Sequence, residues 1–393
     1  MGIFKHKDKA AGAADYYDYN LLAVVILLTA FGLIMLYSTS SYIAEIKFGN
    51  DMYYLRRQAG FAGLSLAIML GLSLVDYHVI EKLAGLAYLT ALALMALVRS
   101  PFGRTINGAR RWLRFGPIQF QPSEVAKIAI IIFVPVVIIK MGRRFRGLKA
   151  IMPPLILGLL QAIAAYVFTE NLSTAIIILA ITLVIIFIAH PNTAGFLAVG
   201  AAGAAAIAGG VYYLVRSAAG SDSFRIQRIL VWLSPEKYSD TGGYQIMQAL
   251  YALGSGGLFG KGLGNSTQKL GSVPEAMNDM IFSIVCEELG VFGGVLLLVM
   301  FAFMLYRLFV IAQNAPDLYG SLMVTGIFGH ISLQVILNIC VVINLIPTTG
   351  VTLPFVSYGG TSLLFLMAEM AIALSVSRKI RFKTDTKELW KGR

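Results

Sequence analysis

The residue with the clearest chemical potential is Asp279, which ends the polar segment Val-Pro-Glu-Ala-Met-Asn-Asp at residues 273–279. An apolar run begins directly after it, at Met280. An ionised carboxylate is costly to hold where a loop enters a lipid-immersed helix, so such a residue is a functional candidate by default. Because a carboxylate can accept a proton, we predict that Asp279 is a catalytic base. The alternative is that Asp279 caps the following helix, since aspartate is favoured at N-caps.

A second group of candidates is cationic and lies in a stretch that is too polar to span a membrane. Its arginines are Arg99, Arg104, Arg110, Arg111 and Arg114. Guanidinium groups bind phosphate oxygens in a bidentate manner, so the stretch predicts a clamp for a substrate phosphate, centred on Arg110 and Arg111. The alternative is that these side chains reach lipid phosphates. Lys261 and Lys269 are further candidates for contact with the same anion.

A third candidate is a pair of opposite charges inside an apolar run. Glu124 and Lys127 are three residues apart and therefore share one helical face. Charged side chains at membrane depth seldom face lipid. The pair either neutralises itself and orients helices, or lines a polar cavity that opens outward. Gln121 and Ser123 would make the mouth of that cavity polar.

Two loops interrupt the apolar pattern. Residues 254–264 hold many glycines, which allow positive φ and close backbone approach, but they lack the order of a nucleotide-binding loop. Residues 347–360 are rich in Pro and Gly yet nearly as apolar as a membrane span. Such a segment is tolerated only where protein or a cavity shields its backbone, so we expect a re-entrant or lid-like outer loop.

The elements that position these residues follow from composition. Of 393 residues, 58% are hydrophobic and 13% are charged, far from the roughly 25% charged of soluble proteins. Apolar runs of about 20 residues cross a bilayer, and they do so as helices. We therefore expect an all-α integral membrane protein with about ten transmembrane helices. The runs are 20–42, 58–75, 79–98, 121–141, 151–169, 172–190, 194–215, 280–306, 319–345 and 361–378.

Charge distribution predicts the orientation of this single polytopic domain. The two tails and the short loops on their side together carry the larger share of Lys and Arg, which places both termini in the cytoplasm. Residues 1–19 and 379–393 are then cytoplasmic tails, and residues 216–279 form a long extracytoplasmic loop between the seventh and eighth helices. The net charge of +12 is spread over loops and tails, so nucleic-acid binding is not expected. The scattered Cys and His residues predict neither a disulfide nor a dedicated metal centre.

Several motifs, in order, resemble the SEDS family of bacterial cell-wall proteins, which includes FtsW, RodA and SpoVE. The motifs are Gly-Ala-Arg-Arg-Trp at 108–112, Gln-Pro-Ser-Glu at 121–124, Gly-Tyr-Gln at 243–245, Pro-Glu-Ala at 274–276 with Asp279, Glu-Glu-Leu-Gly at 287–290 and Pro-Phe-Val-Ser-Tyr-Gly-Gly at 354–360. On these motifs, Trp112, Glu275, Ser357 and Tyr358 are expected to contact substrate. Two departures are Glu-Asn-Leu-Ser-Thr at 170–174, where the family often has Gln-Pro-Asp-Leu-Gly-Thr, and Met277-Asn278, where it often has His-Thr.

The resemblance implies a ten-helix peptidoglycan glycosyltransferase that polymerises lipid II at the outer face of the plasma membrane, with a class B penicillin-binding protein as partner. The 108–112 motif and Ala276 are closer to the FtsW and SpoVE branch than to RodA, which implies septal synthesis and contact with other division proteins. Because pyrophosphate departs without protonation, one base and a cationic clamp suffice, with a loosely held Mg²⁺ or Mn²⁺ as a further candidate. The alternatives are a lipid II flippase and a non-catalytic scaffold.

Overall fold

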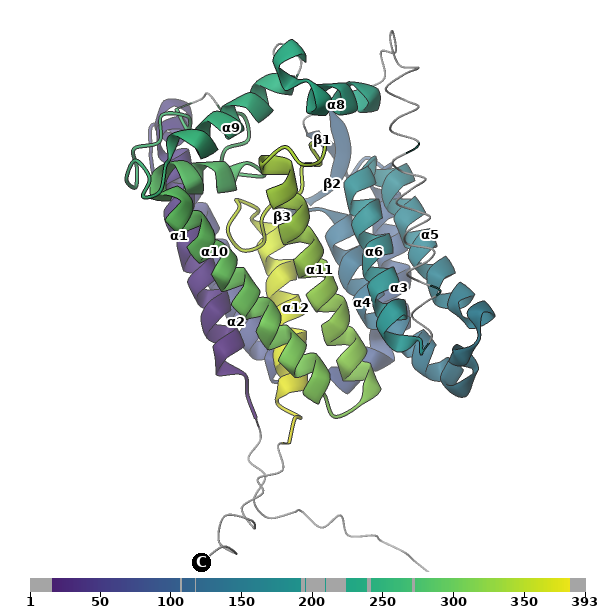
Figure 1. Ribbon diagram of the computed structural model, residues 1–393. Coiled ribbons are helices and arrows are strands. Elements are labelled where there is room, and N and C mark those ends of the chain that lie inside the picture. Colours follow the sequence, from purple (N-terminus) through teal and green to yellow (C-terminus); the bar gives the residue numbers. More distant parts are fainter. Residues whose placement is uncertain are drawn as a thin grey trace, which may run out of the picture.

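The computed structural model describes residues 16–381 apart from 107, 117, 192–194, 196–208, 210–223, 239–241 and 271–272. It is a bundle of long helices, with two short helices and a small sheet across one end (Figure 1). The helices are α1 Tyr19–Phe48, α2 Tyr53–Ser73, α3 Tyr77–Leu97, α4 Pro122–Met141, α5 Met152–Thr169, α6 Leu172–Ala189, α8 Phe224–Leu233, α9 Tyr244–Ser255, α10 Ile281–Asn314, α11 Leu318–Val342 and α12 Thr361–Ser377. The strands are β1 Gly103–Ile106, β2 Ala109–Phe115 and β3 Ile118–Phe120. Short 3₁₀ helices occupy Gly142–Arg146, Leu148–Ile151 and Pro235–Tyr238.

The predicted membrane helices coincide with helices of the bundle, except the run 194–215, which falls almost wholly outside the described residues. Seven described helices are long and apolar enough to cross a membrane, and α12 is a shorter apolar helix. The helical membrane fold is therefore confirmed, while the count of ten stays a prediction. Of the predicted 216–279 loop, the described part forms α8, a 3₁₀ turn, α9 and the turn before α10.

Several helices extend beyond the apolar runs that marked them. The run 280–306 corresponds to α10, which continues to Asn314, so Arg307 lies within a helix and not in a loop. Its guanidinium lies 2.8 Å from the carboxylate of Asp18, which also caps α1 by accepting from the Leu21 amide at 2.9 Å. Hydropathy marks the lipid-immersed part of a helix, whereas the hydrogen-bonded backbone continues into the headgroup region. This ion pair joins the start of α1 to α10.

The arginine-rich stretch forms a three-stranded antiparallel sheet, which the sequence did not predict. Gly108 and Gly116 have φ of 76° and 59° near its turns, a conformation that glycine adopts without strain. Side chains alternate between the two faces of a strand. Arg104 and Thr105 of β1 pair with Trp112 and Arg110, so Trp112 and Arg110 lie on opposite faces, and Arg111 between them is the extra residue of a bulge.

The glycine-rich stretch runs against a kink in α10. Backbone hydrogen bonds join Lys261 to the Glu287 carbonyl at 3.0 Å and Val291 to the Gly257 carbonyl at 3.0 Å. The kink lies at Gly290, whose φ of 69° is unfavourable for other residues. A Cβ on Gly260 would lie 2.2 Å from the Glu288 carbonyl oxygen. The close backbone approach predicted for these glycines is confirmed.

Candidate active site

Asp279 lies in the turn that leads into α10, at the end of the bundle crossed by α8 and α9 (Figure 1). It is 8% exposed, and its Oδ1 atom is buried without a hydrogen-bond partner in the described structure. Burial raises the pKa of Asp279 to about 7, and the nearby charge of Glu275 adds to the effect. A carboxyl group with these properties can exchange a proton at neutral pH.

The capping alternative for Asp279 is wrong. The N-cap of α10 is Met280, and no side chain makes the capping hydrogen bond at this helix start. A capping aspartate would give its oxygen to an amide of the first turn. Because Oδ1 has no such partner, capping does not account for this carboxylate.

The turn itself is held by the segment between α11 and α12. The hydroxyl of Ser357 donates to the Asn278 carbonyl at 2.6 Å, and the Tyr358 amide donates to the Met277 carbonyl at 2.9 Å. From α11, the buried Asn338 donates to the carbonyls of Asp279 at 2.7 Å and Val351 at 2.8 Å. The predicted substrate residues Ser357 and Tyr358 thus contact the catalytic turn itself, and Asn338 is a contact that the sequence did not reveal.

The 347–360 segment is packed inside the protein and does not lie over it as an open loop. Val351, Leu353, Phe355 and Val356 are all buried. The segment passes so close to α1 that a Cβ on Gly32 would lie 2.6 Å from the Phe355 carbonyl oxygen. Shielding of its backbone by protein, expected for an apolar segment without helical hydrogen bonds, is confirmed.

Asn338→Leu tests the support of the turn. The change keeps a similar volume but leaves the carbonyls of Asp279 and Val351 without donors, at about 1–3 kcal/mol each. We expect a lower thermal unfolding midpoint and a loss of activity. Gln334→Leu is the matched control, because Gln334 is buried on the same helix and donates to one carbonyl, that of Thr352 at 3.0 Å. Equal activity losses in the two variants would argue against a specific role for Asn338.

One arginine acts on the charge of Asp279, and a second is coupled to the first. Arg228, on α8, lowers the pKa of Asp279 through its charge and donates to the Thr348 carbonyl at 3.1 Å. Its own pKa is lowered by burial, as is that of Arg111, whose charge is coupled to that of Arg228. The Nε atom of Arg111 is buried without a partner in the described structure. Arg228 is therefore the cation near Asp279, and Arg111 lies near Arg228.

Arg228 was missed in the sequence because it stands alone in a long loop. The amphipathic pattern of residues 224–233 was the available signal. The helix is fastened by Trp232, whose indole donates to the Asn344 carbonyl at 3.1 Å. This contact between distant parts of the chain brings Arg228 to the site.

Arg110 has a different partner from Arg111. Its guanidinium donates to the Ser100 carbonyl at 2.5 Å, just after the end of α3. Trp112 pairs with Arg104 on the other face of the sheet and is half-buried. The structure thus divides the predicted pair: Arg111 is coupled to Arg228, whereas Arg110 braces the connection between α3 and the sheet.

Lys261 and Lys269 are engaged in ion pairs with α10. The Nζ atom of Lys261 lies 2.7 Å from Glu287, and that of Lys269 lies 2.8 Å from Glu288. Both carboxylates are fully buried. Both lysines therefore have partners within the protein, and their contact with a phosphate stays a prediction. They hold the glycine-rich stretch on α10.

Glu275 is exposed, with φ of 57°, and its carboxylate accepts from the side chain of Asn278. Its charge contributes to the raised pKa of Asp279. Glu275 therefore shapes the turn and its electrostatics. No contact in the described structure tests the direct substrate contact that the motif implied.

Glu124 and Lys127 form the predicted ion pair at the start of α4, with 2.9 Å between Oε2 and Nζ. Lys127 is buried, and the nearby Gln121 side chain donates to the Ser123 hydroxyl at 2.8 Å. The pair is confirmed. Its place in an outward-opening cavity stays a prediction.

A double-mutant cycle measures the coupling of this pair. Glu124→Ala or Lys127→Ala alone leaves an unpaired buried charge, which costs about 3–5 kcal/mol. We expect each single variant to express and unfold worse than the double variant, as read by yield and thermal unfolding in detergent. Strict additivity of the two changes would show that the charges do not interact.

The residues of the site do not make a metal centre on their own. Among the described residues, no group of three or more His, Cys, Asp or Glu side chains could hold a metal ion. Asp279 offers a single unpartnered oxygen. A divalent cation at this site would have to take most of its ligands from a bound phosphate.

Comparison with known proteins shows the family to which the chain belongs. Residues 18–382 match the cell cycle protein family FTSW_RODA_SPOVE. Stage V sporulation protein E of Bacillus subtilis (strain 168) is 38% identical over 366 residues, covering 93% of this chain and 98% of that protein. A probable peptidoglycan glycosyltransferase FtsW of Geobacter sp. (strain M18) is 36% identical over 371 residues, covering 93% and 98%.

Solved structures also align with this chain over most of its length. A chain from a study of the coordination of polymerization and crosslinking by a peptidoglycan synthase complex aligns with a TM-score of 0.75 and 28% identity, over 92% of this chain and 98% of that one. The rod shape determining protein RodA of Thermus thermophilus aligns with a TM-score of 0.64 and 29% identity, over 92% and 97%.

Proposed function

The chain belongs to the FtsW/RodA/SpoVE family of cell cycle proteins, and from this premise we propose that it is a peptidoglycan glycosyltransferase that polymerises lipid II into glycan strands. The observation that carries the proposal is the buried carboxylate of Asp279, whose pKa is raised to about 7 near Arg228, a cation that is in turn coupled to Arg111. This is the pairing that the reaction needs: a base for the incoming hydroxyl and positive charge for the departing pyrophosphate.

In the chemical step the substrates, Asp279 and water account for every proton and electron pair. The acceptor hydroxyl oxygen attacks the anomeric carbon of the donor sugar, and its proton passes to the carboxylate of Asp279. The bond from that carbon to the pyrophosphate oxygen breaks, and its electron pair leaves with the pyrophosphate. Asp279 then releases the proton to water, which a pKa of about 7 permits at neutral pH.

The charge that develops on the leaving oxygen needs fixed donors. We assign this role to Arg111 and Arg228, in place of the clamp on Arg110 and Arg111 that the sequence suggested. Two guanidinium groups can each offer paired N–H donors to phosphate oxygens. Their partial burial strengthens such contacts, because little water competes with the ligand. A loosely bound Mg²⁺ or Mn²⁺ would share the pyrophosphate charge.

The pH profile follows from the raised pKa of Asp279. Because only the ionised carboxylate accepts a proton, kcat/KM should rise with pH through about 7 and level off above it. Below that point the rate should fall about tenfold per pH unit. Polymerisation of lipid II across pH 5–9 measures the profile. A flat profile down to pH 5 would remove an aspartate with this pKa from the rate-determining step.

The proposal includes an orientation in the membrane and a partner protein. We propose that both termini lie in the cytoplasm, so that the site opens at the outer face of the plasma membrane. The chain would act with a class B penicillin-binding protein, the transpeptidase that crosslinks the strands, and with other division proteins in septal synthesis. The FtsW relatives and the similarity to a peptidoglycan synthase complex support this assignment.

Purified protein incubated with purified lipid II, with and without its transpeptidase partner, tests the function. Glycan strands on a denaturing gel are the expected result, and they should be absent without the protein. A lipid II flippase would instead move labelled lipid II between the leaflets of a vesicle without forming strands. A scaffold would do neither.

A further inference from the structure

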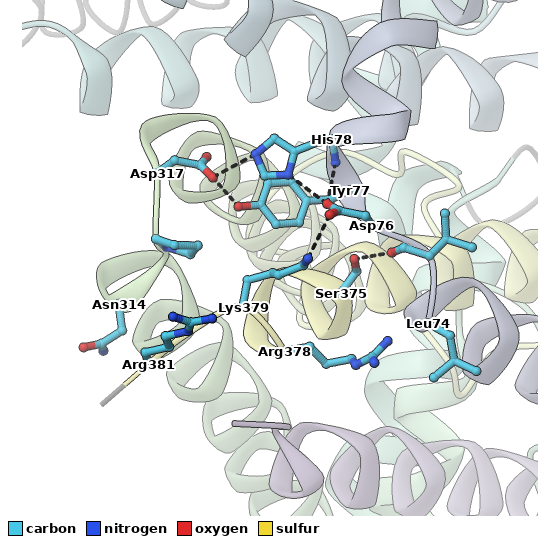
Figure 2. A pocket seen from close by; sticks show the side chains of 12 residues that line it. Leu74, Asp76, Tyr77, His78, Asn314, Asp317, Ser375, Arg378, Lys379 and Arg381 are labelled. Carbon is cyan, nitrogen blue, oxygen red and sulfur yellow. Dashed lines mark hydrogen bonds and ion pairs between the residues drawn. The ribbon is translucent and has the colours of Figure 1, made fainter. Parts of the chain in front are cut away.

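A second pocket lies at the far end of the molecule from Asp279. The two sites are at opposite ends of α10, which begins just after Asp279 and ends at Asn314. The pocket has a volume of about 640 Å³. Its walls are the α2–α3 connection, the α10–α11 connection and the end of α12 (Figure 2). Its volume suits a small molecule or a headgroup.

The acidic side chains of this pocket are already used by its own walls. Asp76 lies 2.8 Å from the Nζ atom of Lys379 and 2.8 Å from the ring of His78. Hydrogen bonding to Lys379, against the effect of burial, lowers the pKa of Asp76. Asp317 accepts from the Gly320 amide at 2.8 Å and from the hydroxyl of Tyr77. Both carboxylates therefore serve to fasten the connections together.

Two guanidinium groups retain unused donors. Arg378 makes one hydrogen bond, from Nη1 to the Ser73 carbonyl at 3.3 Å. Arg381 is exposed and has no hydrogen bond or ion pair within the part of the chain that the structure describes. Each guanidinium carries five N–H donors and no acceptor, so the partner they lack is an anion. Figure 2 shows Arg378 extending toward Leu74 and Arg381 beside Asn314, so the two guanidinium groups lie on different sides of the pocket.

The rim of the pocket is apolar. Leu74 is 68% exposed and Val75 is 41% exposed, and both line the opening. They lie in the connection between α2 and the apolar helix α3. Cations beside exposed apolar side chains match the two parts of a phospholipid, an anionic head and an acyl chain.

We propose that this pocket binds an anionic phospholipid, with its headgroup phosphate on Arg378, its acyl chain along Leu74 and Val75, and Arg381 adding positive charge on the other side of the pocket. The occupant joins the connections that α2, α10 and α12 make at this end of the bundle. The proposal is independent of the glycosyltransferase assignment, because none of its residues belongs to the site around Asp279.

Lipid binding to the purified full chain tests the proposal. Native mass spectrometry in detergent would compare short-chain phosphatidylglycerol with phosphatidylcholine of the same chain length. We expect the wild-type chain to prefer phosphatidylglycerol and the double variant R378Q/R381Q to lose roughly tenfold or more in affinity for it. The matched control is R143Q/R144Q, which removes two exposed guanidinium groups after α4 at the same end of the bundle and should keep the preference.

Three results would overturn the proposal. Equal losses in the two double variants would reduce the effect to overall charge. An unchanged preference in R378Q/R381Q would place the lipid elsewhere. Displacement of the lipid by an equal concentration of inorganic phosphate would mean that the pocket takes a soluble anion and not a lipid. The thermal unfolding midpoint of each variant, measured in the same detergent without added lipid, verifies that it is folded.

Discussion

Asp279→Asn should abolish nearly all polymerisation of lipid II while the protein still folds and inserts. The amide has almost the same volume as the carboxyl group but cannot accept the hydroxyl proton, and a general base contributes roughly 10²–10⁴ in rate. Stability should be maintained or improved, because the buried carboxylate is held against a desolvation cost that raises its pKa to about 7. The measurements are initial rates of strand formation and the thermal unfolding midpoint in detergent.

Glu275→Gln is the control for Asp279→Asn. It removes a neighbouring carboxylate from an exposed position, and its charge is one cause of the raised pKa of Asp279. We expect this variant to remain active, with the rising limb of the pH profile moved to lower pH. Near-normal strand synthesis by Asp279→Asn, with the same pH profile as wild type, would remove this residue from the mechanism.

Arg111→Lys should lower turnover by roughly 10²–10³, the effect of removing one preorganised donor to a developing anion. Lysine keeps the charge but lacks the planar pair of donors that fits phosphate oxygens. Arg228→Lys should have a similar effect, because Arg228 is coupled both to Arg111 and to Asp279. Single-turnover rates with saturating lipid II separate this loss from weaker substrate binding.

Arg110→Lys is the matched control on the same strand. The guanidinium of Arg110 donates to the Ser100 carbonyl, a contact that an ammonium group can reproduce. We expect a small change in turnover and a modest loss of stability. Equal sensitivity of Arg110 and Arg111 to lysine would indicate general contact with lipid headgroups and would leave the pyrophosphate without an assigned clamp.

The helical frame and the position of the base could be predicted from the sequence because both depend on local properties. Apolar runs determine which segments enter lipid, whatever their neighbours in space. Asp279 is conspicuous because it stands where a polar segment meets such a run. The Glu124–Lys127 pair follows from helical spacing alone, since residues three apart share a face.

The partners of the base were decided by the tertiary structure. Arg228 comes close to Asp279 because Trp232 and Asn344 join α8 to the segment after α11, a contact between residues more than a hundred positions apart. The separate partners of Arg110 and Arg111 required a sheet, and the stretch 103–120 lacks the apolar alternation by which a strand is recognised.

The partners of Lys261 and Lys269 likewise depended on the tertiary structure. Lys261 and Lys269 were cations without visible partners in the sequence, and the carboxylates that pair with them lie on α10. Asn338 reaches the catalytic turn from α11 for a similar reason. Hydropathy and helical spacing act over a few residues, so the sequence by itself determined the helices and marked Asp279 as the candidate base. Charge pairing and hydrogen bonding depend on distance in space, so only the tertiary structure determined which cations already have a partner within the protein.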